Sequence, residues 1–178
     1  MREILYRGKR KDNGDWVEGY YTELPCGSLG ATIFSNDDEL VCEDTKSYII
    51  KVFTKQHTNY SNSNPLQVIE CEKYEVIPET VEQFTGLHDK NGNKIFEGDI
   101  VKVTYTERRQ YQGVSYQDKH SCIEEVIYSE ESACFMLKIM CESIPLYRPL
   151  HNFGSQANIK ELEAIGNVFD NLELLEEL

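Results

Sequence analysis

Two Asn-Gly steps, each set between short runs of aromatic and β-branched residues, limit what this chain can fold into. Asn13-Gly14 lies between the runs at 4–8 and 16–21, and Asn91-Gly92 has the same kind of setting. Asn and Gly tolerate the positive φ that a tight turn between two strands requires. The pattern therefore predicts a β-hairpin at each of the two sites.

Other stretches rich in Val, Ile, Tyr and Phe recur at close intervals, with turn residues between them and no sustained helical period. Such spacing is typical of a β-barrel or β-sandwich. One helical turn is expected at 79–83 and another at 171–178, and the polar residues 106–121 are expected to form a loop. Strands are predicted at 31–34, 47–54, 66–76, 83–87, 94–96, 123–128, 133–141 and 163–169.

The step Gly98-Asp99 leads into an Ile-Val strand. This is common at the entry strand of small SH3-like barrels, where Gly permits a sharp bend and the Asp side chain ties the turn backbone. The predicted fold is mainly β, with antiparallel strands, little helix, and an SH3-like (pseudo)barrel portion capped by an additional β meander. We assign 1–82 to an N-terminal hairpin and meander region and 83–178 to the barrel region, the two packed as one unit.

Charge and hydropathy narrow the classes of partner. The net charge is −13, which opposes broad binding to nucleic-acid phosphates and suits basic protein partners. Met1-Arg2-Glu3-Ile4 leads into a charged run, unlike a signal peptide, and no window approaches the length of a transmembrane helix. We expect no membrane association and a cytoplasmic location, where the six cysteines stay reduced.

The search for reactive or metal-binding groups finds no complete set. No Cys-x-x-Cys is present, and His120-Ser121-Cys122 offers two ligands only. Asp89, Asn91 and Asn93 have the spacing of a calcium loop, but Lys94 stands where that loop needs Gly. No Gly-x-Ser-x-Gly, dinucleotide or P-loop motif occurs. We predict no metal, no cofactor and no enzymatic activity.

The run 133–141 is apolar except for Lys138. A half-buried antiparallel strand alternates apolar and polar residues, so both faces of this one are expected to be covered. A subunit interface and a lid from the same chain are equally good ways to cover them. If it is an interface, the contact residues are Phe135, Leu137, Ile139 and Met140.

A weaker alternative is the binding of single-stranded nucleic acid through 106–121. That stretch mixes cationic side chains with aromatic stacking surfaces, as single-strand binders do. The strongly acidic background opposes this function. The contact residues would be Arg108, Arg109, Tyr111 and Tyr116.

Three blocks together resemble the YopX-like family of phage and prophage proteins. The first runs from Arg2 to Gly19 and contains Asn13-Gly14-Asp15-Trp16, and the second runs from Val76 to Val101 and contains Gln83-Phe84-Thr85-Gly86-Leu87. The third is Ile165-Gly166-Asn167-Val168-Phe169-Asp170-Asn171. The resemblance implies a mostly β fold with an SH3-like portion, a phage origin inside a bacterial cytoplasm, and no catalytic residues.

The function expected from these observations is that of a non-enzymatic phage accessory protein. It would act by binding another protein, from the host or the phage, or by assembling with copies of itself as a homo-oligomer. The apolar run and the acidic surface motivate this expectation.

Overall fold

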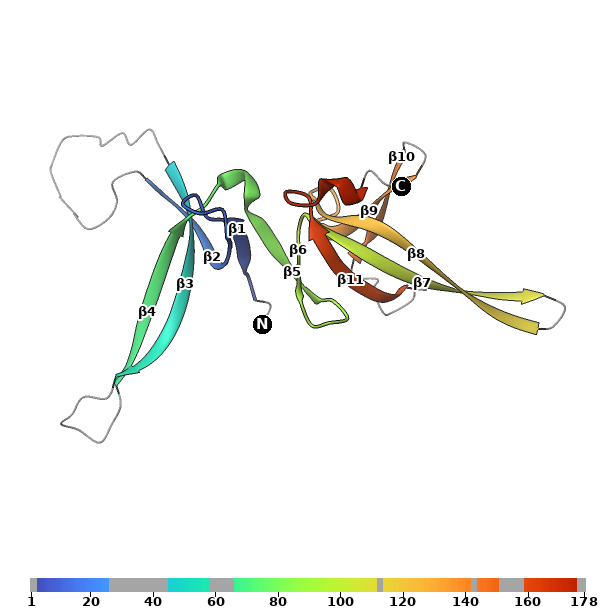
Figure 1. Cartoon of the computed structure of the whole chain (residues 1–178), viewed down its shortest axis with the longest axis horizontal. Coiled ribbons are helices and arrows are strands. Elements are labelled where there is room, and N and C mark those ends of the chain that lie inside the picture. The colour runs from blue at the N-terminus through green and yellow to red at the C-terminus, as the bar shows by residue number, and fades with distance from the viewer. Residues whose placement is uncertain are drawn as a thin grey trace. The chain divides into compact units, whose positions relative to one another are not determined.

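The computed structural model is mostly β and antiparallel, as predicted (Figure 1). It divides into two compact units, Ile4–Glu82 and Gln83–Leu178, the second including the first three residues of the chain. We call them the N-terminal unit and the C-terminal unit. The predicted strand 31–34 lies outside the described residues. The residues described are 3–25, 45–57, 66–111, 114–141, 144–150 and 159–175.

The N-terminal unit is an antiparallel sheet in the order β4-β3-β2-β1. The Asn13-Gly14 hairpin is confirmed, because β1 and β2 pair around it and Gly14 has φ 77°. A single 3₁₀ turn, η1 (Pro78–Thr80), follows the last strand. The strands are β1 (Tyr6–Lys9), β2 (Trp16–Pro25), β3 (Thr45–His57) and β4 (Leu66–Glu75).

Three apolar residues form a core cluster among the described residues of the N-terminal unit. Val17, Ile49 and Val76 are buried together, with tyrosine rings packed around them. Gly19 lets β2 approach β3 closely, since a Cβ there would lie 2.3 Å from the backbone oxygen of Ile50. Any side chain larger than hydrogen would therefore push these two strands apart.

The C-terminal unit holds a hairpin and a five-stranded antiparallel sheet in the order β10-β9-β8-β7-β11. The hairpin joins β5 (Glu82–His88) to β6 (Lys94–Phe96) across the predicted Asn91-Gly92 turn, where Gly92 has φ 86°. A 3₁₀ turn, η3 (Leu172–Leu175), comes last. The sheet strands are β7 (Asp99–Tyr111), β8 (Val114–Ser129), β9 (Cys134–Cys141), β10 (Ile144–Pro149) and β11 (Ile159–Asn167).

One face of the five-stranded sheet forms the core of the C-terminal unit. Cross-strand pairs such as Val126 and Leu137 place apolar side chains on that face. In the described part of the chain the strand order stays open from β10 to β11, so the SH3-like detail remains a prediction. The buried cluster consists of Ile95, Val101, Val103, Val126, Phe135, Leu137, Leu150 and Leu162.

The predicted loop at 106–121 is wrong in part. β7 continues to Tyr111 and β8 starts at Val114, and the two strands pair from Ile100–Glu125 to Tyr111–Val114. Polar composition does not separate a loop from a two-stranded ribbon, because backbone hydrogen bonds rather than buried side chains hold the ribbon's strands together. Figure 1 shows this long hairpin in yellow-green and yellow.

Candidate functional site

In the loop with calcium-like spacing, the Asp89 carboxylate binds hydrogen-bond donors from the chain itself. The buried Asp89 carboxylate accepts hydrogen bonds from the backbone N–H groups of Asn91 and Asn93, both at 2.8 Å. It also accepts from the Asn93 side chain at 3.1 Å and from Ala164 N–H at 3.3 Å. Burial alone would raise the pKa of Asp89, but these hydrogen bonds outweigh it and hold the pKa below its usual value. The residue fixes a turn and docks that turn onto β11.

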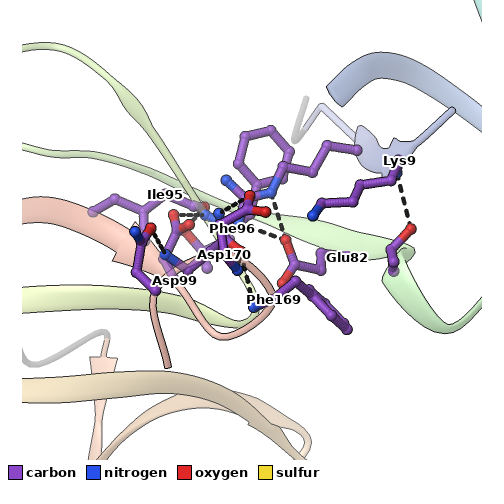
Figure 2. A network of polar contacts seen from close by, with 12 residues as sticks. Lys9, Glu82, Ile95, Phe96, Asp99, Phe169 and Asp170 are labelled. Carbon is purple, nitrogen blue, oxygen red and sulfur yellow. Dashed lines mark hydrogen bonds and ion pairs between the residues drawn. The ribbon is translucent and has the colours of Figure 1, made fainter. Parts of the chain in front are cut away.

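Gly98 and Asp99 shape the entry to β7 as predicted. Gly98 has φ 72°, and its N–H donates to the carbonyl of Val126. The Asp99 carboxylate, 2% exposed, accepts from the backbone N–H of Phe96 at 2.8 Å (Figure 2). A carboxylate buried in this way stabilises a turn and is not open to a substrate.

The polar residues of the third block also bind backbone. The Asn167 side chain accepts from the N–H groups of Phe169 and Asp170, at 2.9 and 3.0 Å. Asn171 packs closely against Gly166, because a Cβ added at Gly166 would lie 2.6 Å from the Oδ1 atom of Asn171. These residues form the turn that ends β11.

The basic residues near the N-terminus are largely engaged within the N-terminal unit. The Arg7 Nε atom donates to Glu82 at 2.5 Å, and the Arg7 guanidinium lies 4.8 Å from the centre of the Trp16 ring. The Lys9 ammonium lies 5.5 Å from the same ring, and the Lys9 backbone N–H donates to Thr80 Oγ1 (Figure 2). Cationic side chains therefore flank the single tryptophan.

One buried carboxylate gathers several polar side chains on the core face of the C-terminal sheet. Glu124 is 0% exposed. Its Oε1 atom accepts from the Tyr105 hydroxyl at 2.5 Å, from the Cys122 thiol at 3.0 Å and from Arg148 Nη2 at 2.9 Å. The Arg148 guanidinium also lies 4.4 Å from the centre of the Tyr105 ring. Glu124 Oε2 and Arg148 Nε find no hydrogen-bond partner among the described residues.

This buried carboxylate cluster opposes nucleophilic chemistry at Cys122. Burial, and then the hydrogen bond to Glu124, raises the pKa of Cys122 to about 12. The same two causes raise the pKa of Tyr105. A thiolate, not a thiol, is the nucleophile, so the raised pKa disfavours nucleophilic attack by Cys122 at neutral pH. His120 is exposed, and Cys122 donates to Glu124 instead of to it.

The residues predicted to form an interface separate into different environments. Phe135 and Leu137 are 7% and 1% exposed and pack into the core of their own unit. They therefore have little surface to offer a partner. Ile139 is half-buried, and the side chain of Met140 lies outside the described part. The interface role of these four residues stays a prediction, and the opposite face of β9 offers a different surface.

That opposite face carries a groove of about 370 Å³. Ile127 and Met136, which pair across β8 and β9, contribute to it together with Tyr147 of β10. Tyr147 is 49% exposed. Ser129, Glu131 and Ser132 complete the lining, so the groove combines apolar side chains with an acidic one. We call this the outer groove.

The proposed nucleic-acid contacts lie on the β7–β8 hairpin. The backbone register places Arg108 opposite Gln117 and Arg109 opposite Tyr116, with Tyr111 at the end of β7. The structure therefore brings one of the arginines and one of the tyrosines to facing positions. Their side chains lie outside the described part of the chain.

Two residues of the buried carboxylate cluster escaped sequence reasoning. Tyr105 and Arg148 are 19 and 24 residues from Glu124, and no motif marks either of them. The adjacent residues Glu124 and Glu125 are the available sequence signal for a buried carboxylate, because neighbouring residues on a strand point to opposite faces of the sheet. Glu125 does face the other way, where it binds Lys138 at 2.7 Å.

Neither a metal site nor a membrane span emerges from the described residues. No group of three or more His, Cys, Asp or Glu among them is placed to hold a metal ion. No helix among them is long and apolar enough to cross a membrane.

Comparisons with known proteins identify a family. The family model described as YopX protein matches residues 5–176. No curated protein matches the sequence. Among solved structures, the crystal structure of protein EF1440 from Enterococcus faecalis is similar, with a TM-score of 0.49 and 22% identity, over 98% of this chain and 99% of that one. Because the family match spans nearly the whole sequence, the chain belongs to the YopX family.

Proposed function

We propose that this chain is a non-enzymatic accessory protein, encoded by a phage or prophage, that works in the bacterial cytoplasm by binding another protein or copies of itself. The polar residues of the three sequence blocks support this proposal, because Asp89, Asp99 and Asn167 bind backbone within their own unit. Their hydrogen bonds are used to hold turns. These polar residues thus serve the fold of the described part of the chain, which supports a function carried by its surfaces.

The outer groove is the observation on which the proposal depends. Its apolar members Ile127 and Met136 lie on a sheet face where solvent reaches Tyr147. Partly exposed aromatic and Met side chains are typical of interface cores. The exposed Glu130 and Glu131 of the β8–β9 turn lie at one end of these strands, which favours a partner with basic residues beside an apolar anchor.

Affinity capture with matched surface variants tests the proposal. Tyr147→Glu changes the outer groove, whereas Tyr20→Glu changes an equally exposed tyrosine, 53% exposed, in the other unit. We expect a lysate of the lysogenic host to yield a partner with the wild type and with Tyr20→Glu, but not with Tyr147→Glu. Equal capture by all three proteins, or none by any, would contradict the outer groove as the binding surface.

Nucleic-acid binding is the second candidate, favoured by the facing positions of Arg109 and Tyr116. The net charge of −13 opposes it. Titration with single-stranded DNA at low salt decides the matter, because electrostatic attraction is strongest there. Saturable binding that is lost in Arg109→Ala would support this alternative, and no binding at low salt would eliminate it.

A further inference from the structure

The β7–β8 hairpin continues past both of its neighbours in the C-terminal unit. β11 pairs with β7 only as far as Tyr105, and β9 pairs with β8 only as far as Glu125. β7 and β8 stay paired out to Tyr111 and Val114, and Figure 1 shows them running on together. We call 106–111 and 114–119 the β7–β8 arm.

The arm is two strands wide in the described part of the chain. A hairpin of two strands is at best marginally stable in water. Among the described residues, no strand pairs with the outer edge of β7 beyond Tyr105. Such an edge presents unpaired backbone N–H and C=O groups, which are a template for another strand. The arm contains no proline to block that edge.

The backbone register fixes which charged residues of the arm stand opposite each other. In the register of the hairpin, Glu107 stands opposite Asp118, and like charges directly opposite each other destabilise a strand pair. Arg109 stands opposite Tyr116 and so meets no carboxylate at its cross-strand position. Glu107 and Arg109 therefore stand two residues apart on the same face of β7, with opposite charges.

We propose that the β7 edges of two copies of this chain pair antiparallel, with the two-fold axis passing between the two Arg108 residues. When a two-fold axis normal to the sheet relates two antiparallel strands, one residue must face its own copy across the axis, because facing side chains share one side of the sheet. The register centred on Arg108 sets Glu107 of each copy opposite Arg109 of the other. It makes two opposite-charge pairs at the cost of one Arg108–Arg108 contact. This inference rests on the self-assembly part of the proposed function.

A second copy fits this edge better than nucleic acid does. The arm carries three cationic and two anionic side chains, so its net charge is +1, and the rest of a chain of −13 carries −14. A polyanion would gain little from one net positive charge and would be repelled by Glu107 and Asp118. An antiparallel second copy of β7 instead places an opposite charge across from both Glu107 and Arg109.

Charge reversal with a compensating double variant tests the pairing. Sedimentation equilibrium gives the dimer Kd of the wild type, Glu107→Arg, Arg109→Glu and the double variant carrying both changes. We expect each single change to weaken the dimer about tenfold, because like charges then face each other twice. The double variant restores opposite charges at both positions, so its Kd should return close to that of the wild type. Glu107→Gln, which adds no new charge, should weaken the dimer less.

The outcomes separate this inference from the proposed function. A wild type that stays monomeric at high concentration would defeat both the pairing and the self-assembly part of that function. A dimer whose Kd is the same in all variants would defeat only the pairing through β7. Tighter binding of single-stranded DNA by Glu107→Arg, with no change in the dimer, would assign the arm to nucleic acid instead. Circular dichroism confirms that each variant compared is folded.

Discussion

At the scale of single residues, the buried Glu124 carboxylate is the most demanding feature of the C-terminal unit. Its cation, Arg148, reaches it from an edge strand, and the Arg148 side chain is 41% exposed while Glu124 is 0% exposed. Removing one partner of a buried ion pair costs about 3–5 kcal/mol, because a charge is left buried and unpaired. We expect Arg148→Met to lower the free energy of unfolding by about 3 kcal/mol, toward the lower end because Arg148 is partly solvated.

Urea unfolding of a double-mutant cycle checks this expectation. Removing both charges, in Arg148→Met with Glu124→Leu, should recover much of the loss, since apolar groups can replace a buried pair at little cost. A double variant as unstable as the sum of the two single variants would show that the ion pair is not what holds β10 to this face.

Cys122 and Cys71 should differ in reactivity because their surroundings differ. Cys71 is exposed, whereas burial and the bond to Glu124 raise the pKa of Cys122 to about 12. At about pH 8 almost none of the Cys122 population is thiolate, the form that reacts. Iodoacetamide should therefore label Cys71 first in the native protein, and both residues in urea, as peptide mass spectrometry would show. Equal native labelling rates would refute the shielding of Cys122.

Asp89 should make the C-terminal unit sensitive to acid. Its pKa is lowered below the ordinary 3.8 by its hydrogen bonds, despite its burial. Its contribution to stability is therefore fully present above about pH 4 and is lost as the pH falls through the lower folded value. Asp89→Asn should be less stable than the wild type at neutral pH, by about 2 kcal/mol. The difference should shrink below pH 3.8 in urea titrations, and a constant difference would contradict this explanation.

At the scale of elements, the sequence predicted what depends on neighbouring residues and missed what depends on register. The Asn-Gly steps predict the β1–β2 and β5–β6 hairpins, because positive φ is a local property of Gly14 and Gly92. The apolar run of β9 indicated coverage on both faces, yet only pairing with β8 shows that Phe135 faces the core and Met136 the outer groove. The meeting of Glu124 with Arg148 depends on three strands, so no local pattern could reveal it.

Two glycines, Gly92 in a turn and Gly166 near the end of β11, should respond differently to the same substitution. Gly92 has φ 86° and open space around it, so Gly92→Ala adds backbone strain only, about 1 kcal/mol. Gly166 has no room, since a Cβ would meet Asn171 at 2.6 Å. Gly166→Ala should therefore cost more, and Asn171→Ala in the same chain should recover part of the loss. Thermal unfolding checks the order, and equal losses would argue against the contact with Asn171.

At the scale of the whole molecule, the net charge of −13 makes the salt dependence of binding informative. Added salt should change the affinity for a second copy and the affinity for single-stranded DNA in opposite directions. Copies of this chain repel each other over the Debye length, which falls from about 30 Å at 0.01 M salt to about 8 Å at 0.15 M. Exposed ion pairs such as the proposed Glu107–Arg109 contacts contribute only about 0.2–1 kcal/mol each, so their screening loses less than the relief of repulsion gains. The dimer should therefore tighten as salt rises over this range. Binding to single-stranded DNA would weaken instead, because it depends on counterion release. Light scattering across a salt series measures the sign, and a dimer that dissociates on adding salt would show that attraction between opposite charges, rather than β-strand pairing, holds the copies together.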